Sequence, residues 1–375
     1  MNFKNLKSAG DLSGKKVIIR LDVNVPIVNG NIRDDFRLRK ALPTLEHLKS
    51  AGAKTLIIGH IESSETDSLQ AIFDYFNSKL PVKFATDLTQ AADLMAGLKT
   101  GEFVLLENLR RFKGEKENSQ SFAKEIAGLG EIYINEAFSV SHRPHASIVG
   151  LPKLLPSFAG LVFEAEFSNL SKAFNPPKPF LLILGGAKVE TKLPLIKKLL
   201  PKADTVFVGG VPANDFFKAK GFEVGASAVS QIKLDANLLA ETKIMLPLDV
   251  VIDGGGGKCT IAPEELGKKD EILDAGLETV AELNFLASKS KFVLWNGPLG
   301  NYERGFVEGT ENLARALAEC GAETIVGGGD TLAALEKLNL FDKFSFVSTA
   351  GGAMLDFLSS GTLPGIEALE NSLEV

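Results

Sequence analysis

Two glycines and two lysines form the clearest candidate site for chemistry in this sequence. An apolar run ends at Gly185 and Gly186, and a segment with helical spacing that carries Lys188 and Lys192 follows at once. Glycine lets a backbone approach a ligand closely, and the amides of a helix N-terminus favour phosphate. Two lysines four residues apart share a helix face, here at the end where the dipole disfavours cations. The pattern indicates a phosphate-binding turn, with a tight turn followed by surface lysines as the alternative.

The segment matches neither of the two common nucleotide motifs. There is no G-x-x-x-x-G-K-[ST], and no G-x-G-x-x-G that opens a helix after a strand. The second absence argues against a dinucleotide-dependent dehydrogenase.

A carboxylate follows another glycine run late in the chain. Asp330 and Thr331 come directly after the glycines at 327–329, where an apolar run ends. One carboxylate together with phosphate oxygens is a common ligand set for Mg²⁺. The alternative is that these residues cap the next helix, since Asp and Thr are both good N-caps.

The first part of the chain carries a different set of charges. Seven of the nine arginines and all four histidines lie in the first 145 residues. A guanidinium group binds carboxylate or phosphate through two parallel hydrogen bonds. We therefore expect an anion site wherever Arg37, Arg110, Arg143 and His60 converge, with separate surface salt bridges as the alternative.

Apolar runs of strand length alternate with segments of helical period along the whole chain. This alternation predicts an α/β fold with parallel sheets, whose strands helices cover on both faces. We expect strands at 16–23, 54–59, 103–108, 132–137, 180–186, 205–210, 249–255, 292–297, 324–329 and 344–352.

Glycines recur at the expected strand ends of the second half. Ligands of open parallel sheets bind beyond the carboxyl ends of the strands, so these positions matter for binding. The repetition favours a glycine-lined nucleotide site over ordinary tight turns. The glycines concerned lie at 185–186, 209–210, 254–257, 297, 327–329 and 351–352.

A length of 375 residues suggests two domains. The segment 158–174 could form one helix, which the prolines of 175–179 would end. We expect an N-terminal domain at 1–157, an interdomain helix at 158–175 and a C-terminal domain from 176.

Composition excludes several other classes of protein. A net charge of −6 argues against nonspecific nucleic-acid binding. No apolar run is long enough for a membrane span, and the first residues lack the apolar core of a secretory signal. The two cysteines, Cys259 and Cys320, have no metal-site spacing and cannot build a disulfide framework, which favours a reducing, cytoplasmic location.

Seven motifs, in content, order and spacing, resemble the phosphoglycerate kinase family along nearly the whole chain. They are RLDVNVP (20–26), LLENLR (105–110), INEAFSVSHRPHAS (134–147), LLILGGAKVETK (181–192), VLWNGPLGNYE (293–303), TIVGGGDT (324–331) and FVSTAGGA (346–353).

The resemblance implies two doubly wound parallel-sheet, Rossmann-like domains that face a cleft and are joined by a hinge helix. It also implies reversible phosphoryl transfer between 1,3-bisphosphoglycerate and Mg-ADP, which gives 3-phosphoglycerate and Mg-ATP in glycolysis and gluconeogenesis. The triose phosphate would bind to 1–157 and the nucleotide to 176–353, while 354–375 would return towards the first domain. We expect a monomer with Mg²⁺ as cofactor and without nucleic-acid or membrane partners.

The resemblance also implies roles for particular residues. The substrate-binding residues would be Asp22, Asn24, Arg37, His60, Arg110 and Arg143. The nucleotide-binding residues would be Gly186, Ala187, Lys188, Lys192, Gly209, Leu273, Asn296, Pro298, Glu303, Gly329, Asp330 and Thr331, with Asp330 also the metal ligand. The residues closest to the transferred group would be Arg37, Lys188, Gly351 and Gly352.

The chain departs from the family pattern at several positions. After His60 the family reads H-L-G-R-P, whereas here Glu62 and Ser63 replace the glycine and a substrate-site arginine. Asp215 stands where threonine is common, and Ala350 replaces the first of three glycines. The segment 272–279 lacks a glycine and a proline that are usual near the adenosine.

These departures leave one alternative of another class. It is a catalytically weakened paralogue that binds nucleotide in a regulatory or interaction role. Retention of both the arginine set and the lysine set argues against it, because a protein without activity needs only one of them.

Overall fold

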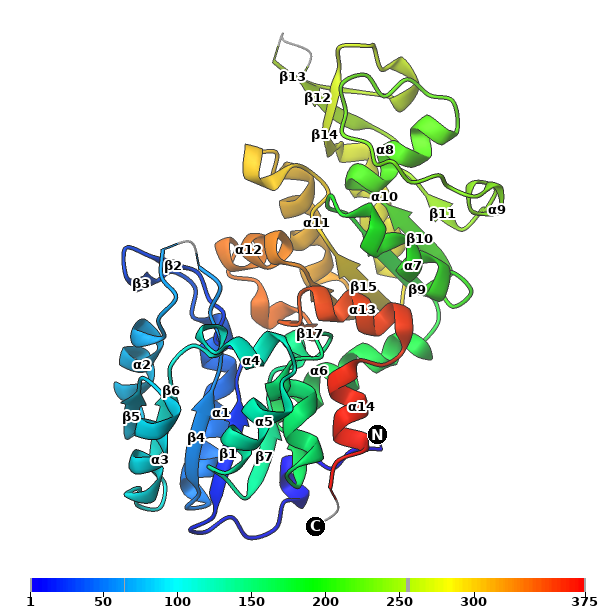
Figure 1. The fold of residues 1–375 in the computed structure, drawn as a ribbon. Helices are drawn as coiled ribbons and strands as arrows, with labels where there is room; N and C mark the ends of the chain where they lie inside the picture. The colour runs from blue at the N-terminus through cyan, green and yellow to red at the C-terminus, as the bar shows by residue number, and fades with distance from the viewer. Residues whose placement is uncertain (1, 64, 254–256, 374–375) are drawn as a thin grey trace. The chain divides into compact units, whose positions relative to one another are not determined.

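The computed structural model describes residues 2–63, 65–253 and 257–373, and the chain divides into two compact units (Figure 1). Unit 1 comprises Met1–Ser168 and Thr362–Val375, and unit 2 comprises Asn169–Gly361. Each unit contains one six-stranded sheet in which all neighbouring strands are parallel. These sheets confirm the α/β class that the alternating pattern predicts.

The sheet of unit 1 has the strand order β5-β6-β4-β1-β7-β8. Its strands are β1 (Lys16–Arg20), β4 (Lys54–Ile58), β5 (Val82–Ala85), β6 (Phe103–Leu106), β7 (Ile132–Asn135) and β8 (Ser157–Ala159). Strands β2 (Ile27–Val28) and β3 (Asn31–Ile32) form a separate short hairpin. The strand order reverses at β1. Strands β4, β5 and β6 lie on one side of β1, and the later strands β7 and β8 lie on the other.

Helices cover both faces of this sheet, which explains why its strands are apolar at successive positions. Val17 and Ile19 of β1 belong to one buried cluster, and Ile18 between them belongs to another. The first cluster includes residues of α1 and α2, and the second includes residues of α3 and α5. The helices of unit 1 are α1 (Phe36–Ser50), α2 (Gln70–Asn77), α3 (Leu88–Ala96), α4 (Lys113–Lys116), α5 (Gln120–Ala127) and α14 (Pro364–Glu370).

The sheet of unit 2 has the strand order β11-β10-β9-β15-β16-β17. Its strands are β9 (Phe180–Leu184), β10 (Thr205–Val208), β11 (Ile244–Met245), β15 (Phe292–Asn296), β16 (Glu323–Gly327) and β17 (Phe346–Val347). The helices of this unit are α7 (Val189–Leu199), α8 (Gly210–Ala219), α9 (Ala236–Leu239), α10 (Leu277–Lys289), α11 (Glu308–Glu319), α12 (Gly329–Lys337) and α13 (Gly352–Ser360). Here the order reverses between β9 and β15.

A second, antiparallel sheet in unit 2 corrects one of our expectations. The described part of the expected strand 249–255 does not join the parallel sheet; β12 (Val250–Asp253) pairs with β13 (Lys258–Ile261) and β14 (Glu271–Ala275). Its apolar side chains, Val250 and Ile252, pack against Ala213 and Phe217 of α8. A short apolar run contains no information about its pairing partner. Of the glycines expected at 254–257, those at 254–256 lie outside the described residues.

The segment expected as one helix at 158–174 contains a strand and a helix. Ser157–Ala159 form β8, which pairs with β7, and helix α6 begins at Leu161 and ends at Ser171. The Glu136 carboxylate accepts hydrogen bonds from the Val162 amide and so stabilises the helix start. The division between the units falls inside α6. Near the end of the chain α13 packs on α7 within unit 2, and unit 1 resumes at Thr362.

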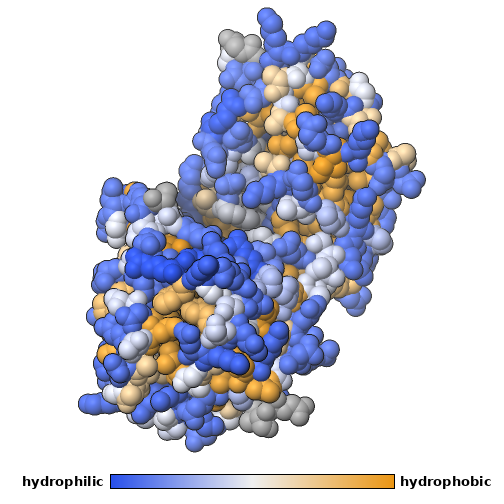
Figure 2. All heavy atoms as spheres, in the orientation of Figure 1, coloured by the Kyte–Doolittle hydropathy of each residue, from blue (hydrophilic) through white to orange (hydrophobic). Residues whose placement is uncertain are grey.

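The other expected strands are present, although each is one to several residues shorter than its apolar run. We missed β2, β3, β5, β8, β11, β13 and β14, which are short or lie at sheet edges. Hydrophilic residues dominate the face in Figure 2, with hydrophobic atoms in scattered areas. Among the described residues, none of the helices combines the length and the apolar character that a bilayer span requires.

Candidate functional site

The register of the parallel sheet in unit 2 brings glycine-bearing turns together. Asn296, the last residue of β15, lies beside Leu184 of β9 and Gly327 of β16. The turns that follow these three strands therefore start from one edge of the sheet. This edge is also where the strand order reverses, which is the usual position of a ligand site in open α/β sheets.

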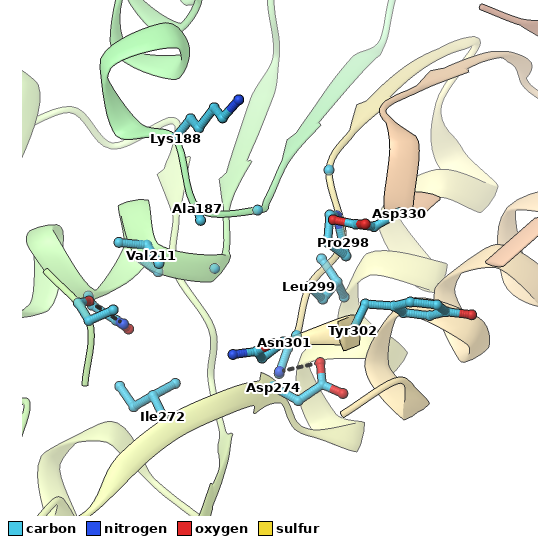
Figure 3. A pocket seen from close by; sticks show the side chains of 18 of the residues that line it. Ala187, Lys188, Val211, Ile272, Asp274, Pro298, Leu299, Asn301, Tyr302 and Asp330 are labelled. Carbon is cyan, nitrogen blue, oxygen red and sulfur yellow. Dashed lines mark hydrogen bonds between the residues drawn. The ribbon is translucent and has the colours of Figure 1, made fainter. Parts of the chain in front are cut away.

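A cavity of about 500 Å³ opens at this edge (Figure 3). We call it the glycine-lined cavity, because glycines from the turns after β9, β10, β15 and β16 contribute to its wall. Val211 and Ile272 lie on one side of it, and Pro298, Leu299 and Tyr302 lie on the other. Apolar walls with a few polar groups are typical of a site for a small organic molecule.

Two glycines in the turns around the cavity are required by backbone geometry. A Cβ atom on Gly185 would collide with the carbonyl oxygen of Pro298, so the two turns can approach only without a side chain there. Gly328 precedes α12 with a φ of +109°, a conformation that L side chains rarely adopt. Both positions bring backbone close to the cavity.

The two lysines after β9 occupy different environments. Lys188 is the N-cap of α7 and its side chain is exposed, whereas Lys192 lies inside the helix and is only 5% exposed. The Lys192 ammonium group donates a hydrogen bond to Asn296 Oδ1. Burial, together with the charge of Lys188, lowers the pKa of Lys192 to about 8. Both lysines line the cavity, although Lys188 precedes the helix on which we expected it.

Asp330 also lines the cavity, in the first turn of α12. In the part of the chain that the structure describes, neither its carboxylate nor the Lys188 ammonium group has a hydrogen bond or ion pair. Helices α7 and α12 also begin without a side-chain cap. Unpaired charges of both signs beside uncapped helix N-termini would suit a metal-bound phosphate group.

The residues around Asp330 fit a magnesium ion that is held mainly by its phosphate ligand. Across the described residues there is no group of three His, Cys, Asp or Glu side chains that could hold a metal. The neighbouring Thr331 hydroxyl is buried and has no hydrogen-bond partner within the described residues. Magnesium commonly takes one or two carboxylates and completes its shell with water and phosphate oxygens. Asp330 supplies the carboxylate of such a ligand set.

Most of the expected nucleotide-binding residues line this cavity. They are Gly186, Ala187, Lys188, Lys192, Leu273, Asn296, Pro298, Glu303, Gly329 and Asp330. Gly209 and Thr331 do not line it themselves but adjoin Gly210 and Asp330, which do. Gly351 and Gly352 lie outside the lining, at the start of α13, where Gly351 has a φ of +56°.

We missed Val211, Asn214 and Ile272 of the wall. The Asn214 side chain donates to the Ala228 carbonyl, and its buried oxygen has no hydrogen-bond partner among the described residues. These residues come from α8 and from the antiparallel sheet that packs on it. Only the sequence VPAN, directly after the glycines at 209–210, could have indicated them.

In unit 1 the expected substrate-binding residues also gather at one edge of the sheet. Arg20, the last residue of β1, lies beside Ile58 of β4 and Asn135 of β7. The loops that follow these strands carry Asp22, Asn24, His60 and Arg143, and the turn after β6 carries Arg110. This edge again includes the point where the strand order reverses.

Arg37 is held in place by the loop after β1. Its Nη1 lies 3.1 Å from Asp22 Oδ2 and donates to the Asn24 carbonyl at 3.0 Å. Asp22 in turn accepts a hydrogen bond from Ser139 at 2.5 Å. The guanidinium group is thus oriented before any ligand binds.

Arg110 and Arg143 meet at Glu62. Glu62 Oε1 lies 3.2 Å from Arg110 Nε, and Oε2 lies 3.8 Å from Arg143 Nη1. The backbone amide of Glu62 donates to Asn24 Oδ1 at 2.9 Å, which links these residues to the loop that holds Arg37. We call Arg37, Arg110 and Arg143 the arginine cluster.

His60 is buried and contacts Arg20 rather than facing solvent. Its Nδ1 lies 2.9 Å from Arg20 Nη2. Burial, reinforced by Arg20, Arg110 and Arg143, strongly lowers the pKa of His60, so the ring is neutral at pH 7. His60 can therefore offer a hydrogen bond but no charge. We did not predict a role for Arg20, because its position inside a strand does not indicate that it lies near the arginine cluster.

Comparison with known proteins identifies the family of this chain. A model of the family described as "Phosphoglycerate kinase" matches residues 6–361. The phosphoglycerate kinase of Borrelia turicatae is 38% identical over 99% of this chain and 100% of its own length. That of Coprothermobacter proteolyticus is 40% identical, with 98% and 99% coverage.

Solved structures give the same result. The structure of phosphoglycerate kinase from Coxiella burnetii matches with a TM-score of 0.85 at 36% identity, over 98% of both chains. That from Pyrococcus horikoshii matches with a TM-score of 0.85 at 28% identity, also over 98% of both chains. Similarity of this extent in sequence and fold establishes that this chain belongs to the phosphoglycerate kinase family, which is a family of enzymes.

Proposed function

We propose that this protein catalyses reversible phosphoryl transfer between 1,3-bisphosphoglycerate and Mg-ADP, giving 3-phosphoglycerate and Mg-ATP in glycolysis. The observation that supports the proposal is the glycine-lined cavity, with the charged side chain of Lys192 within and Lys188 and Asp330 at its wall. Neither Lys188 nor Asp330 has an ion pair among the described residues. Unit 2 would be the nucleotide domain and unit 1 the triose-phosphate domain.

In unit 2 the proposed roles follow from position and charge. The apolar wall with Leu273 and Pro298 would hold the adenosine, with Glu303 at the ribose. Lys192 and the N-terminus of α7 would bind the nucleotide phosphates. Lys188 would contact the phosphoryl group while it is transferred. Asp330 would hold Mg²⁺, whose chemistry is to neutralise charge on the phosphate oxygens, and Thr331 would contact the phosphates beside it.

In unit 1 the arginine cluster would bind the anionic groups of the three-carbon substrate. Arg37 is oriented by Asp22 and Asn24, so its free guanidinium donors need no reorganisation when the substrate arrives. Neutral His60 can contribute a hydrogen bond to the same ligand.

In unit 2, Gly351 and Gly352 would supply backbone amides at the start of α13 to the transferred group.

Phosphoryl transfer asks mainly for positioning and for neutralisation of charge, without a covalent intermediate. Because the two anions are proposed to bind to different units, transfer would need the units to close on each other during the cycle. Closure would exclude water and so limit hydrolysis of the acyl phosphate. We further propose a cytoplasmic monomer, which the two free cysteines support for the compartment.

A coupled assay of ATP formation from 1,3-bisphosphoglycerate and Mg-ADP tests the proposal. We expect steady turnover by the natural protein and a loss on the order of 10²-fold in kcat/KM for Lys192→Ala, because a buried cation for the phosphates is removed. Equal turnover by the two proteins, at the level of the background reaction, would contradict phosphoglycerate kinase activity.

The alternative is a weakened paralogue that binds nucleotide in a regulatory role. One observation favours it: Glu62 places a negative charge beside two arginines of the proposed substrate site. The same assay separates the two functions, since the paralogue would bind Mg-ADP, as calorimetry can measure, without turnover.

A further inference from the structure

Glu62 lies among three cationic side chains of unit 1. Its carboxylate is 3.2 Å from Arg110 Nε, 3.8 Å from Arg143 Nη1 and 3.8 Å from Lys116 Nζ. Three positive charges and one negative charge leave a net charge of +2 in this group. Within the described residues no hydrogen bond to another side chain holds the Glu62 carboxylate, and this side chain is 44% exposed.

Arg110 is only partly satisfied by this contact. Its side chain is 8% exposed, and its buried Nη2 has no hydrogen-bond partner among the described residues. Nε and Nη2 together form one edge of a guanidinium group, which binds two oxygens of a carboxylate or phosphate in parallel. Glu62 approaches Nε alone, so a ligand that engages both atoms would bind Arg110 better.

The backbone of Glu62 is anchored, whereas its side chain is not. The Glu62 amide donates to Asn24 Oδ1 at 2.9 Å, and Asn24 belongs to the loop that holds Arg37. The carboxylate is therefore tethered beside the arginines at high local concentration, yet it can rotate into solvent without disturbing that loop.

We propose that Glu62 is a tethered competitor of the anionic substrate. In the free protein its carboxylate occupies Arg110 and Arg143, and it leaves when a phosphate or carboxylate of the three-carbon substrate binds there. This inference rests on the proposed function of unit 1. It makes Glu62 a residue that sets substrate affinity: its removal should tighten binding and leave the chemical step unchanged, because Glu62 is already displaced in the bound complex.

A structural role for Glu62 predicts the opposite result. If Glu62 served to orient the two arginines, its neutralisation would weaken substrate binding. The sign of the change in affinity therefore separates the two roles.

The test is Glu62→Gln, which keeps the shape of the side chain and removes its charge. Calorimetry without nucleotide should show 3-phosphoglycerate binding about threefold to tenfold tighter than in the natural protein, since each partly exposed ion pair that competes is worth a few-fold in affinity. Inorganic phosphate, as a second probe, should bind tighter as well. In the kinetic assay KM for 3-phosphoglycerate should fall, while kcat and KM for ATP stay within about twofold.

Glu65→Gln is the matched control, three residues along the same loop. Glu65 is exposed and accepts a hydrogen bond from the Asn29 amide, without an ion pair to an arginine. Its neutralisation should leave the affinity for 3-phosphoglycerate unchanged.

Unchanged or weaker 3-phosphoglycerate binding in Glu62→Gln would overturn the proposal, and so would equal gains in both variants. A failure of the proposed function is distinguishable. In that case the natural protein would not form ATP, while calorimetry with 3-phosphoglycerate or phosphate would still report whether Glu62 competes.

Discussion

The two candidate binding regions prepare for anions by different physical means. In unit 1 the positive charge resides on side chains, the arginine cluster, and other side chains partly neutralise it before any ligand binds. In unit 2 the glycine-lined cavity depends on backbone: close turns at Gly185 and Gly328, uncapped starts of α7 and α12, and only two lysines.

Because of this difference, different substitutions should change anion binding in the two regions. One residue elsewhere in the chain can place an opposite charge beside a cationic side chain, as Glu62 does beside Arg110 and Arg143. The partial positive charge of a backbone amide cannot be removed by a substitution. The position of the amide depends instead on the close packing of turns. Unit 1 should therefore respond to changes of charge, and unit 2 to changes of shape.

The largest effect should come from Arg37, which has the most firmly oriented guanidinium group of the cluster. Arg37→Ala should lower kcat on the order of 10²-fold, because a cation placed for the transition state is lost. The affinity for ADP, measured by calorimetry, should not change. Arg39→Ala is the control, since Arg39 pairs with Asp35 on the exposed side of the same helix. An equal loss in both variants would show that the charge of α1, and not the position of Arg37, matters.

A change of shape should break the cavity of unit 2 without any change of charge. Gly185→Ala should weaken ADP binding by roughly tenfold or more, because its Cβ would push against the backbone at Pro298 and overpacking costs on the order of 1–3 kcal/mol. Gly321→Ala is the control, as no atom lies within 4 Å of a Cβ built there. Calorimetry with ADP and with 3-phosphoglycerate checks the result. Weaker binding of 3-phosphoglycerate would argue that the damage is general misfolding.

The smallest effect concerns pH and the buried charge of Lys192 in the cavity. Burial lowers the pKa of Lys192 from its ordinary 10.5 to about 8. Below pH 8 the ammonium group is charged and favours the phosphates; above it the free protein holds a neutral amine, and binding must take up a proton. The Kd for ADP should therefore rise between pH 7 and pH 9, by at most about tenfold for a single titrating group.

Lys192→Arg is the control for this prediction, because arginine keeps its charge throughout the range. Its Kd for ADP should stay flat from pH 7 to pH 9. Calorimetry in buffers of different ionisation enthalpy would show proton uptake by the natural protein only. A flat Kd for the natural protein would mean that Lys192 does not titrate at the binding site.

Local sequence was enough to predict the fold class and where the two candidate sites lie in the chain. Successive apolar residues predicted strands that helices cover on both faces, and Val17, Ile18 and Ile19 confirm the reason, since they face two different buried clusters. Glycines at strand ends and lysines directly after them predicted the cavity, because close backbone approach and helix N-termini are properties of a few consecutive residues.

The sequence alone sets the chemical groups that each unit offers, which are arginines in the first unit and glycines with two lysines in the second. The tertiary structure sets which of these groups contact one another. Nothing local to Glu62 indicates Arg143 or Lys116, and nothing in the run around Val250 indicates an antiparallel partner. The physical reason is that strand register and loop packing are set by contacts between distant segments, so the neutralisation of a charge or the wall of a cavity depends on residues far away in the chain.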